Sequence, residues 1–157
     1  MASAGQVAAT ASRHDLIGLA VGYQPPQFST TDCRGQPHTV TAYTGQVLVL
    51  HFWASWCPYC RGEIPKLTKL AQPDWQAKGV RVLAISIDED PTVLEQFITT
   101  SNLPYPIVAD RQAVWSVADQ YNISGIPVTF VIGRDGDITA RLRGAGDIVG
   151  AVEQALK

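Results

Sequence analysis

Apolar positions along the 157-residue chain follow two spacings, which predict strands alternating with helices. Continuous runs rich in Val, Leu and Ile are typical of strands buried on both faces of a sheet. These runs, and a hairpin closed by an Asp-Gly turn, predict strands over 46–54, 79–88, 105–110, 127–132 and 137–144. Apolar residues three or four positions apart predict helices instead. They cover 58–72, 90–102, 113–122 and 146–157.

The first 26 residues are interpreted as an N-terminal extension. Ser12 is expected to cap a short helix over 13–22, which two consecutive prolines would stop. Residues 27–40 predict two short strands around a turn. The order of elements indicates an α/β fold whose mixed central sheet is parallel in its first part and has an antiparallel last strand. Helices are expected on both faces, with residues 1–157 forming a single domain.

Charge and composition remove several classes of function. The formal net charge is −2 and no block is rich in Lys or Arg, so nothing indicates binding to nucleic acid or to an anionic membrane surface. No apolar run has the length of a membrane span. The first residues lack the basic and apolar regions of a signal peptide, so none is expected in this chain. Membrane association would then require a segment that is not present here.

Cys57 and Cys60 form a Cys-Pro-Tyr-Cys motif where the first long strand passes into a helix. Unpaired N–H groups and the helix dipole stabilise a thiolate at that point. Cys60 lies one turn further along, within reach of a mixed disulfide on Cys57. A zinc site would need a second pair of ligands, yet only Cys33 and three scattered histidines remain. The motif therefore predicts a redox pair that needs no metal or organic cofactor.

The segment VLHFWASWCPYCRGEIP resembles the active-site segment of thioredoxin-fold proteins of the TlpA/ResA type, which are bacterial thiol–disulfide oxidoreductases. The similarity covers roughly residues 26–157. It implies a thioredoxin fold with an N-terminal hairpin extension and an inserted αβ unit. It also implies exchange with protein thiols and disulfides, an upstream thiol redox partner, and a periplasmic or extracytoplasmic location. We favour a reductase, with cytochrome c maturation as a candidate role.

The resemblance assigns roles to residues around the cysteine pair. Pro127 is expected to follow a cis peptide bond, which turns the Ile126 backbone toward an extended substrate. Glu63 matches a glutamate that influences thiol protonation, although a solvated first-turn acid is the plainer interpretation. Trp56 is expected to form an apolar rim for peptide substrates.

Two further residues could tune the thiol pKa values. His51 stands where thioredoxins carry a buried aspartate, so the chain departs from that pattern. We favour a core histidine hydrogen-bonded to a neighbour over a proton acceptor for Cys60. Tyr59 lies between the cysteines and is expected to tune the start of the helix. Cys33 is interpreted as a bystander thiol at a hairpin turn.

Two alternatives remain open at the level of the sequence. Peroxiredoxins share this fold, but they carry Thr three residues before the reactive cysteine, where this chain has Ala54. A copper- or zinc-binding redox or metallochaperone module could use two cysteines and a histidine, but such modules space their cysteines more widely. Metal binding without disulfide exchange would favour the second alternative.

Overall fold

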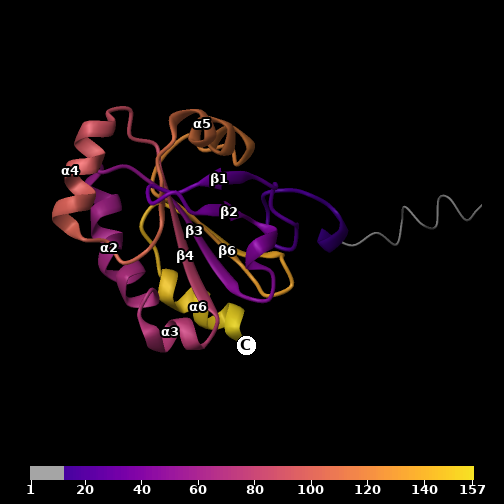
Figure 1. The fold of residues 1–157 in the computed structure, drawn as a ribbon. Coiled ribbons are helices and arrows are strands. Elements are labelled where there is room, and N and C mark those ends of the chain that lie inside the picture. Colours follow the sequence, from indigo (N-terminus) through magenta and orange to yellow (C-terminus); the bar gives the residue numbers. More distant parts are fainter. Residues whose placement is uncertain (1–12) are drawn as a thin grey trace, which may run out of the picture.

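A computed structural model describes residues 13–157, and its centre is a five-stranded mixed sheet of order β5-β4-β3-β6-β7 (Figure 1). β3 and β4 run parallel, as do β4 and β5, whereas β6 is antiparallel to β3 and β7 is antiparallel to β6. The last two strands thus form the predicted hairpin, and the sheet is mixed as expected. The strands are β3 (Val47–Trp53), β4 (Val80–Ser86), β5 (Ile107–Val108), β6 (Val128–Ile132) and β7 (Ile138–Arg143).

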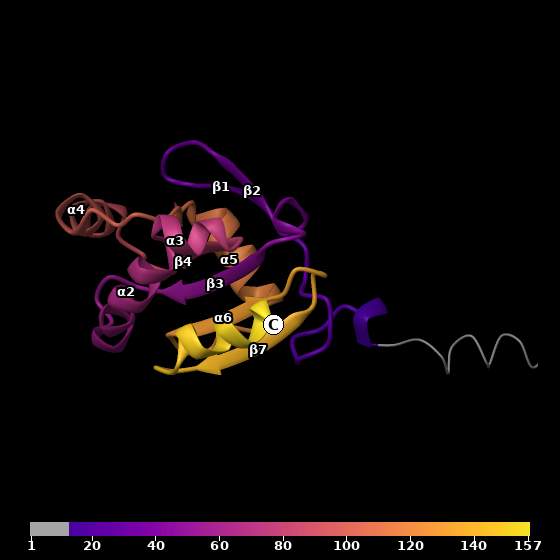
Figure 2. The same cartoon turned by 90° about the horizontal axis from the view of Figure 1, so that it is seen from below.

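Helices cover both faces of the sheet, as predicted. The helices are α2 (Pro58–Leu70), α3 (Pro73–Ala77), α4 (Pro91–Ser101), α5 (Arg111–Gln120) and α6 (Ile148–Leu156). Alternate residues of β3 supply two cores: Val49 and Trp53 pack with α2, α3, α4 and α6, whereas Leu50 and Phe52 pack with α5. Figures 1 and 2 show α5 on the opposite side of the sheet from α2 and α6. β3 is buried along its whole length, which explains its continuous apolar sequence.

The N-terminal hairpin is confirmed, but the predicted helix over 13–22 is wrong. β1 (Ser29–Thr31) and β2 (Pro37–Thr39) pair antiparallel. Residues 13–15 make only a single 3-10 turn, η1 (Arg13–Asp15), and Ser12 lies outside the described residues. The chain then folds back on itself, and Gly22 adopts a φ of 95°, which a helix does not allow, in the turn of this reversal. Hydrogen bonds from Gly18 N–H to Gln24 O and from Gln24 N–H to Leu16 O hold this loop.

Helix boundaries follow the predicted signals closely. The Asp90 side chain accepts hydrogen bonds from the N–H groups of Thr92 and Val93, so it caps α4 as expected. Pro73 ends the run of α2, and it also begins the short helix α3, which the pattern had not predicted. No helix within residues 13–157 is long and apolar enough to cross a membrane.

Candidate active site

The cysteine pair lies where β3 passes into α2. Cys57 is the N-cap of α2, and its Sγ accepts a hydrogen bond of 3.2 Å from the Cys60 N–H. Pro58 begins the helix, where its missing N–H costs no hydrogen bond. Cys57 is 5% exposed and Cys60 is fully buried, so Cys57 is less exposed than a surface nucleophile but is the thiol nearer to solvent. Both are free thiols.

The environment of Cys60 opposes its ionisation. Burial is the main cause, followed by the hydrogen bond and charge of Cys57 and the negative charge of Glu63; together they raise the pKa of Cys60 to about 12. A thiol in this state is a poor nucleophile at neutral pH. Cys60 is therefore suited to the resolving role of thiol–disulfide exchange, in which the second thiol stays protonated until a mixed disulfide forms.

Asp88 fixes the loop that carries the motif. Its carboxylate accepts hydrogen bonds from the Ser55 N–H at 2.9 Å and the Ser55 hydroxyl at 2.6 Å, and another from the Ser86 hydroxyl at 2.6 Å. Asp88 follows β4 and is buried, so it ties the end of β4 to the residues just before Trp56 and Cys57. The sequence analysis did not identify Asp88 because its partner lies 33 positions away.

Glu63 is buried and lies in the second turn of α2, so the plainer interpretation of a solvated first-turn acid is wrong. It is 1% exposed, and its Oε1 accepts a hydrogen bond of 3.0 Å from the Gly146 N–H. Lys66 Nζ lies 3.0 Å from Glu63 Oε2 and donates a 2.8 Å hydrogen bond to the Gly146 carbonyl. The carboxylate thus joins α2 to the loop before α6. Lys66 and Gly146 are members of this cluster that the sequence analysis missed.

His51 occupies the middle of β3, on the face that also carries Val49 and Trp53. Its Nδ1 is 2.9 Å from the Thr129 hydroxyl, and its buried Nε2 has no hydrogen-bond partner among the described residues. Burial lowers the pKa of His51 to about 4, so the imidazole is neutral at pH 7. This arrangement matches the favoured interpretation of a core histidine bonded to a neighbour.

The Ile126–Pro127 peptide bond is cis, as predicted. Val128 is paired with Phe52, so Pro127 lies beside the end of β3 from which the motif loop departs. Ile126 packs against the core that contains both cysteines, and no backbone hydrogen bond to it occurs within residues 13–157. Its backbone groups are therefore available to an extended partner.

Two aromatic side chains of the motif are open to solvent. Trp56 is 60% exposed and Tyr59 is 73% exposed, so both rings are accessible to a partner, and the rim expected of Trp56 stays a prediction. Cys33 lies in the β1–β2 turn, and its exposed thiol has a pKa raised by partial burial and by nearby carboxylates.

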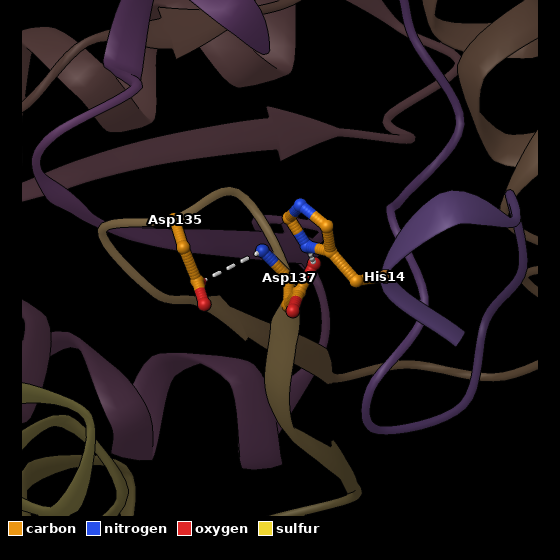
Figure 3. Close-up of side chains that lie close together, drawn as sticks. All are labelled: His14, Asp135 and Asp137. Atoms are coloured by element: carbon orange, nitrogen blue, oxygen red, sulfur yellow. Dashed lines mark hydrogen bonds and ion pairs between the residues drawn. The ribbon is translucent and has the colours of Figure 1, made fainter. Parts of the chain in front are cut away.

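One cluster of metal-ligating residues occurs within residues 13–157, at the other end of the sheet. His14, Asp135 and Asp137 lie together at the β6–β7 turn, with His14 Nδ1 2.5 Å from Asp137 Oδ1 (Figure 3). The strand register separates this cluster from the cysteines, because Ile132 pairs with Leu48 at the start of β3. The cluster is largely exposed and takes no part in the dithiol site.

Comparisons with known proteins agree with this geometry. The AhpC/TSA family matches residues 21–141. Thiol-disulfide oxidoreductase ResA of Geobacillus kaustophilus is 34% identical over 130 residues, which cover 83% of this chain and 73% of the relative. A solved structure of a candidate thiol:disulfide interchange protein DsbE from Chlorobium tepidum has a TM-score of 0.79 at 26% identity, covering 89% of this chain and all of the other. A thioredoxin family protein from Chlorobium tepidum TLS, also a thiol:disulfide interchange protein, has a TM-score of 0.72 at 26% identity, covering 85% and 96% of the two chains.

A CxxC pair at the start of a helix, with a cis proline just before the neighbouring interior strand of a mixed sheet, defines the class of thioredoxin-fold dithiol proteins. Within that class, the chain belongs to the AhpC/TSA family, among the ResA-like thiol–disulfide oxidoreductases. The predicted fold and family are thereby confirmed.

Proposed function

We propose that this chain reduces disulfides of protein substrates through Cys57 and Cys60. The Cys57 thiolate attacks one sulfur of the substrate disulfide, forming a mixed disulfide and releasing the other substrate sulfur as a thiolate. Cys60 loses its proton and attacks Cys57 Sγ, which releases the second substrate thiolate and leaves a Cys57–Cys60 disulfide. Two electrons pass from the dithiol to the substrate, and an upstream thiol partner restores them.

One observation carries this assignment of roles: Cys57 caps the helix and is the thiol nearer to solvent, whereas Cys60 is fully buried. Burial also raises the pKa of Cys60 to about 12, as suits a thiol that acts second. The reductase direction rests on the resemblance to thioredoxins, which also carry Ile before the cis proline, as Ile126 stands here before Pro127.

Four other residues complete the proposed site. Glu63 carries the proton that Cys60 must lose, since it is the acid whose charge acts on that thiol. The exposed ring of Trp56 and the backbone of Ile126, set by Pro127, contact the substrate segment. No cofactor takes part. His51 and Tyr59 influence the pair only through packing and helix geometry.

The family relationship also supports an extracytoplasmic setting, with apocytochrome c as a candidate substrate and the described chain acting as a single thioredoxin-like domain. Relatives named ResA and a candidate DsbE fit such a role. Membrane attachment, if the protein uses it, would come from a segment outside the one described.

Trapping tests the roles of the two thiols. Cys60→Ser should accumulate mixed disulfides on Cys57 with an unfolded disulfide substrate, whereas Cys57→Ser should accumulate none. Mixed disulfides on Cys33 instead would contradict the assignment. The reduction potential of the Cys57–Cys60 pair, measured in a glutathione buffer, tests the direction of electron transfer. A potential of about −270 mV, as in thioredoxin, supports a reductase, and a potential of about −120 mV, as in DsbA, refutes the reductase assignment. Rapid consumption of hydrogen peroxide would favour the peroxidase alternative.

A further inference from the structure

A groove of about 690 Å³ opens beside the cysteine motif, between α4 and α5. Its lining combines Trp56 from the motif loop, Ile87 and Val93 from the α4 side, and Trp115 and Ile123 from the α5 side. Ile87 N–H donates to the Trp53 carbonyl, so the floor lies at the carboxyl ends of the parallel strands β3 and β4. α/β sheets commonly bind their ligands at this edge. Figure 1 shows α4 and α5 rising beyond this end of the sheet.

The groove gathers apolar side chains that folding leaves uncovered. Trp56 is 60% exposed, Trp115 is 62% exposed and Val93 is 45% exposed. Aromatic side chains have a higher free energy in water than in an apolar contact, and they contribute a large share of the binding free energy when a partner covers them. The two tryptophans come from elements nearly 60 positions apart in the sequence, so only the fold brings them to one groove.

The charged residues that line the groove favour a positively charged ligand. Asp88, Glu89 and Asp90 line its α4 side, against the single positive charge of Arg111 among the lining residues. Asp88 is committed to Ser55 and Ser86, and Asp90 caps α4. Glu89 is exposed and makes no hydrogen bond or ion pair with residues 13–157, so its charge is available to a ligand.

The groove is continuous with the proposed substrate platform. Ile123 lines both the groove and a second cleft of about 310 Å³, which includes Ile126, Pro127, Arg141 and Arg143. An extended segment paired with the Ile126 backbone would therefore run into the groove within a few residues of its reacting cysteine. A chain covers about 3.3 Å per residue when extended, so neighbours of that cysteine reach the tryptophans.

We propose that this groove selects the substrate segment: it binds a large apolar side chain close to the reacting cysteine together with a Lys or Arg. This inference rests on the function proposed above and adds the chemistry of the substrate sequence. The apolar side chain packs between Trp56 and Trp115. The basic side chain pairs with Glu89 and lies against an aromatic face, where a cation is also attracted.

A competition for capture tests the proposal. The background is Cys33→Ser with Cys60→Ser, so that only Cys57 can form a mixed disulfide. Two peptides of equal length compete as disulfides with glutathione: one has Phe and Lys on both sides of its cysteine, and the other has Ala and Glu there. Mass spectrometry gives the ratio of the two captured peptides at low and high salt. Reduction of an unfolded disulfide protein by the protein with all three cysteines is measured separately.

We expect the Phe/Lys peptide to be captured about tenfold or more in excess, and Trp115→Ala to lower that ratio about fivefold to tenfold. Salt screening should lower the capture ratio of the starting protein, and Glu89→Lys should abolish this dependence of the ratio on salt. Matched controls are Ile17→Ala, an exposed apolar residue of the N-terminal segment, and Glu95→Lys, an exposed acid of α4 outside the groove. Both should keep the starting ratio.

Two results overturn different claims. If capture is equal for the two peptides, or if Trp115→Ala and Glu89→Lys leave the ratio unchanged, the groove does not select substrate. If the protein fails to reduce the unfolded disulfide protein at all, the proposed function is wrong before the groove is considered.

Discussion

His51 should make the protein progressively less stable as the pH falls below 6.5, and His51→Asn should remove that dependence. The imidazole is 1% exposed, and burial lowers its pKa from 6.5 to about 4. The unfolded chain therefore binds a proton in this interval and the folded chain does not. A pKa lowered by folding contributes stability above the unfolded value of 6.5 that is lost as the pH falls toward 4. The shift corresponds to about 3 kcal/mol over the whole interval, and to about 2 kcal/mol at pH 5.

The assay is urea unfolding of both proteins between pH 8 and pH 4.5. The difference in unfolding free energy between wild type and His51→Asn should be constant above pH 7 and should shrink by about 2 kcal/mol at pH 5. Any cavity left by the smaller side chain changes the constant part only.

His14→Gln serves as a control of opposite sign. The hydrogen bond and charge of Asp137 raise the pKa of His14, so its contribution is present at low pH and is lost as the pH rises. A difference for His51→Asn that stays flat from pH 8 to 4.5 would mean that His51 gains no protection from burial. A difference that widens at low pH would mean that the folded state holds a charged imidazole, and would restore His51 as a cation near the thiols.

Four further outcomes are expected, three at the dithiol site and one in the core beneath α5. Iodoacetamide should label Cys57 and not Cys60 between pH 6 and 9, and peptide mapping that finds Cys60 first would reverse the two roles. Glu63→Gln should slow the resolution of mixed disulfides in stopped-flow measurements, although it removes a negative charge near Cys60; an unchanged rate excludes Glu63 as the proton carrier. Asp88→Asn should lower the unfolding free energy by about 1–3 kcal/mol in urea and slow disulfide exchange, whereas the exposed-site change Asp74→Asn should do neither. Tyr121→Phe should cost about 1–2 kcal/mol, because its hydroxyl donates to a backbone carbonyl at 2.6 Å; an unchanged urea midpoint would contradict this.

Elements with a strong local signal were predictable from the sequence. β3 is a central strand, so burial on both faces imposes an unbroken apolar run. α4 begins at an Asp-Pro pair that supplies both its cap and its first turn. The prediction of a helix over 13–22 was wrong because the spacing of apolar residues carries no information on the backbone conformation that a glycine adopts. The positive φ of Gly22 allows the chain to reverse direction, and hydrogen bonds between Gly22 N–H and Ile138 O and between Ile138 N–H and Tyr23 O tie the reversed segment to β7.

The residues of the candidate site likewise fall into those that a local motif predicts and those that only the fold brings together. Cys57, Cys60 and Glu63 lie within one stretch of seven residues, so a motif contains them. The groups that hold them come from distant positions: Asp88 reaches Ser55 across 33 residues, and Gly146 reaches Glu63 across 83. No local pattern encodes such pairs, because the sheet and the packing of α6 create them.

The surroundings of Cys60 bear on the second half of the exchange, in which the Cys60 thiolate attacks Cys57 Sγ. A single proton transfer from Cys60 would both create that thiolate and remove a charge that opposes it. A thiol with a pKa of about 12 is ionised in only about one molecule in 10⁵ at pH 7, so unaided attack on Cys57 would be slow. Formation of the mixed disulfide removes the Cys57 thiol and its charge, which are two of the causes of that raised pKa. Burial and the charge of Glu63 remain. In the proposed transfer of the Cys60 proton to Glu63, the carboxylate would also lose the charge that opposes the thiolate, whereas the glutamine of Glu63→Gln lacks that charge but cannot accept the proton. Lys66 and the Gly146 N–H hold the carboxylate in place, and they join α2 to the loop before α6.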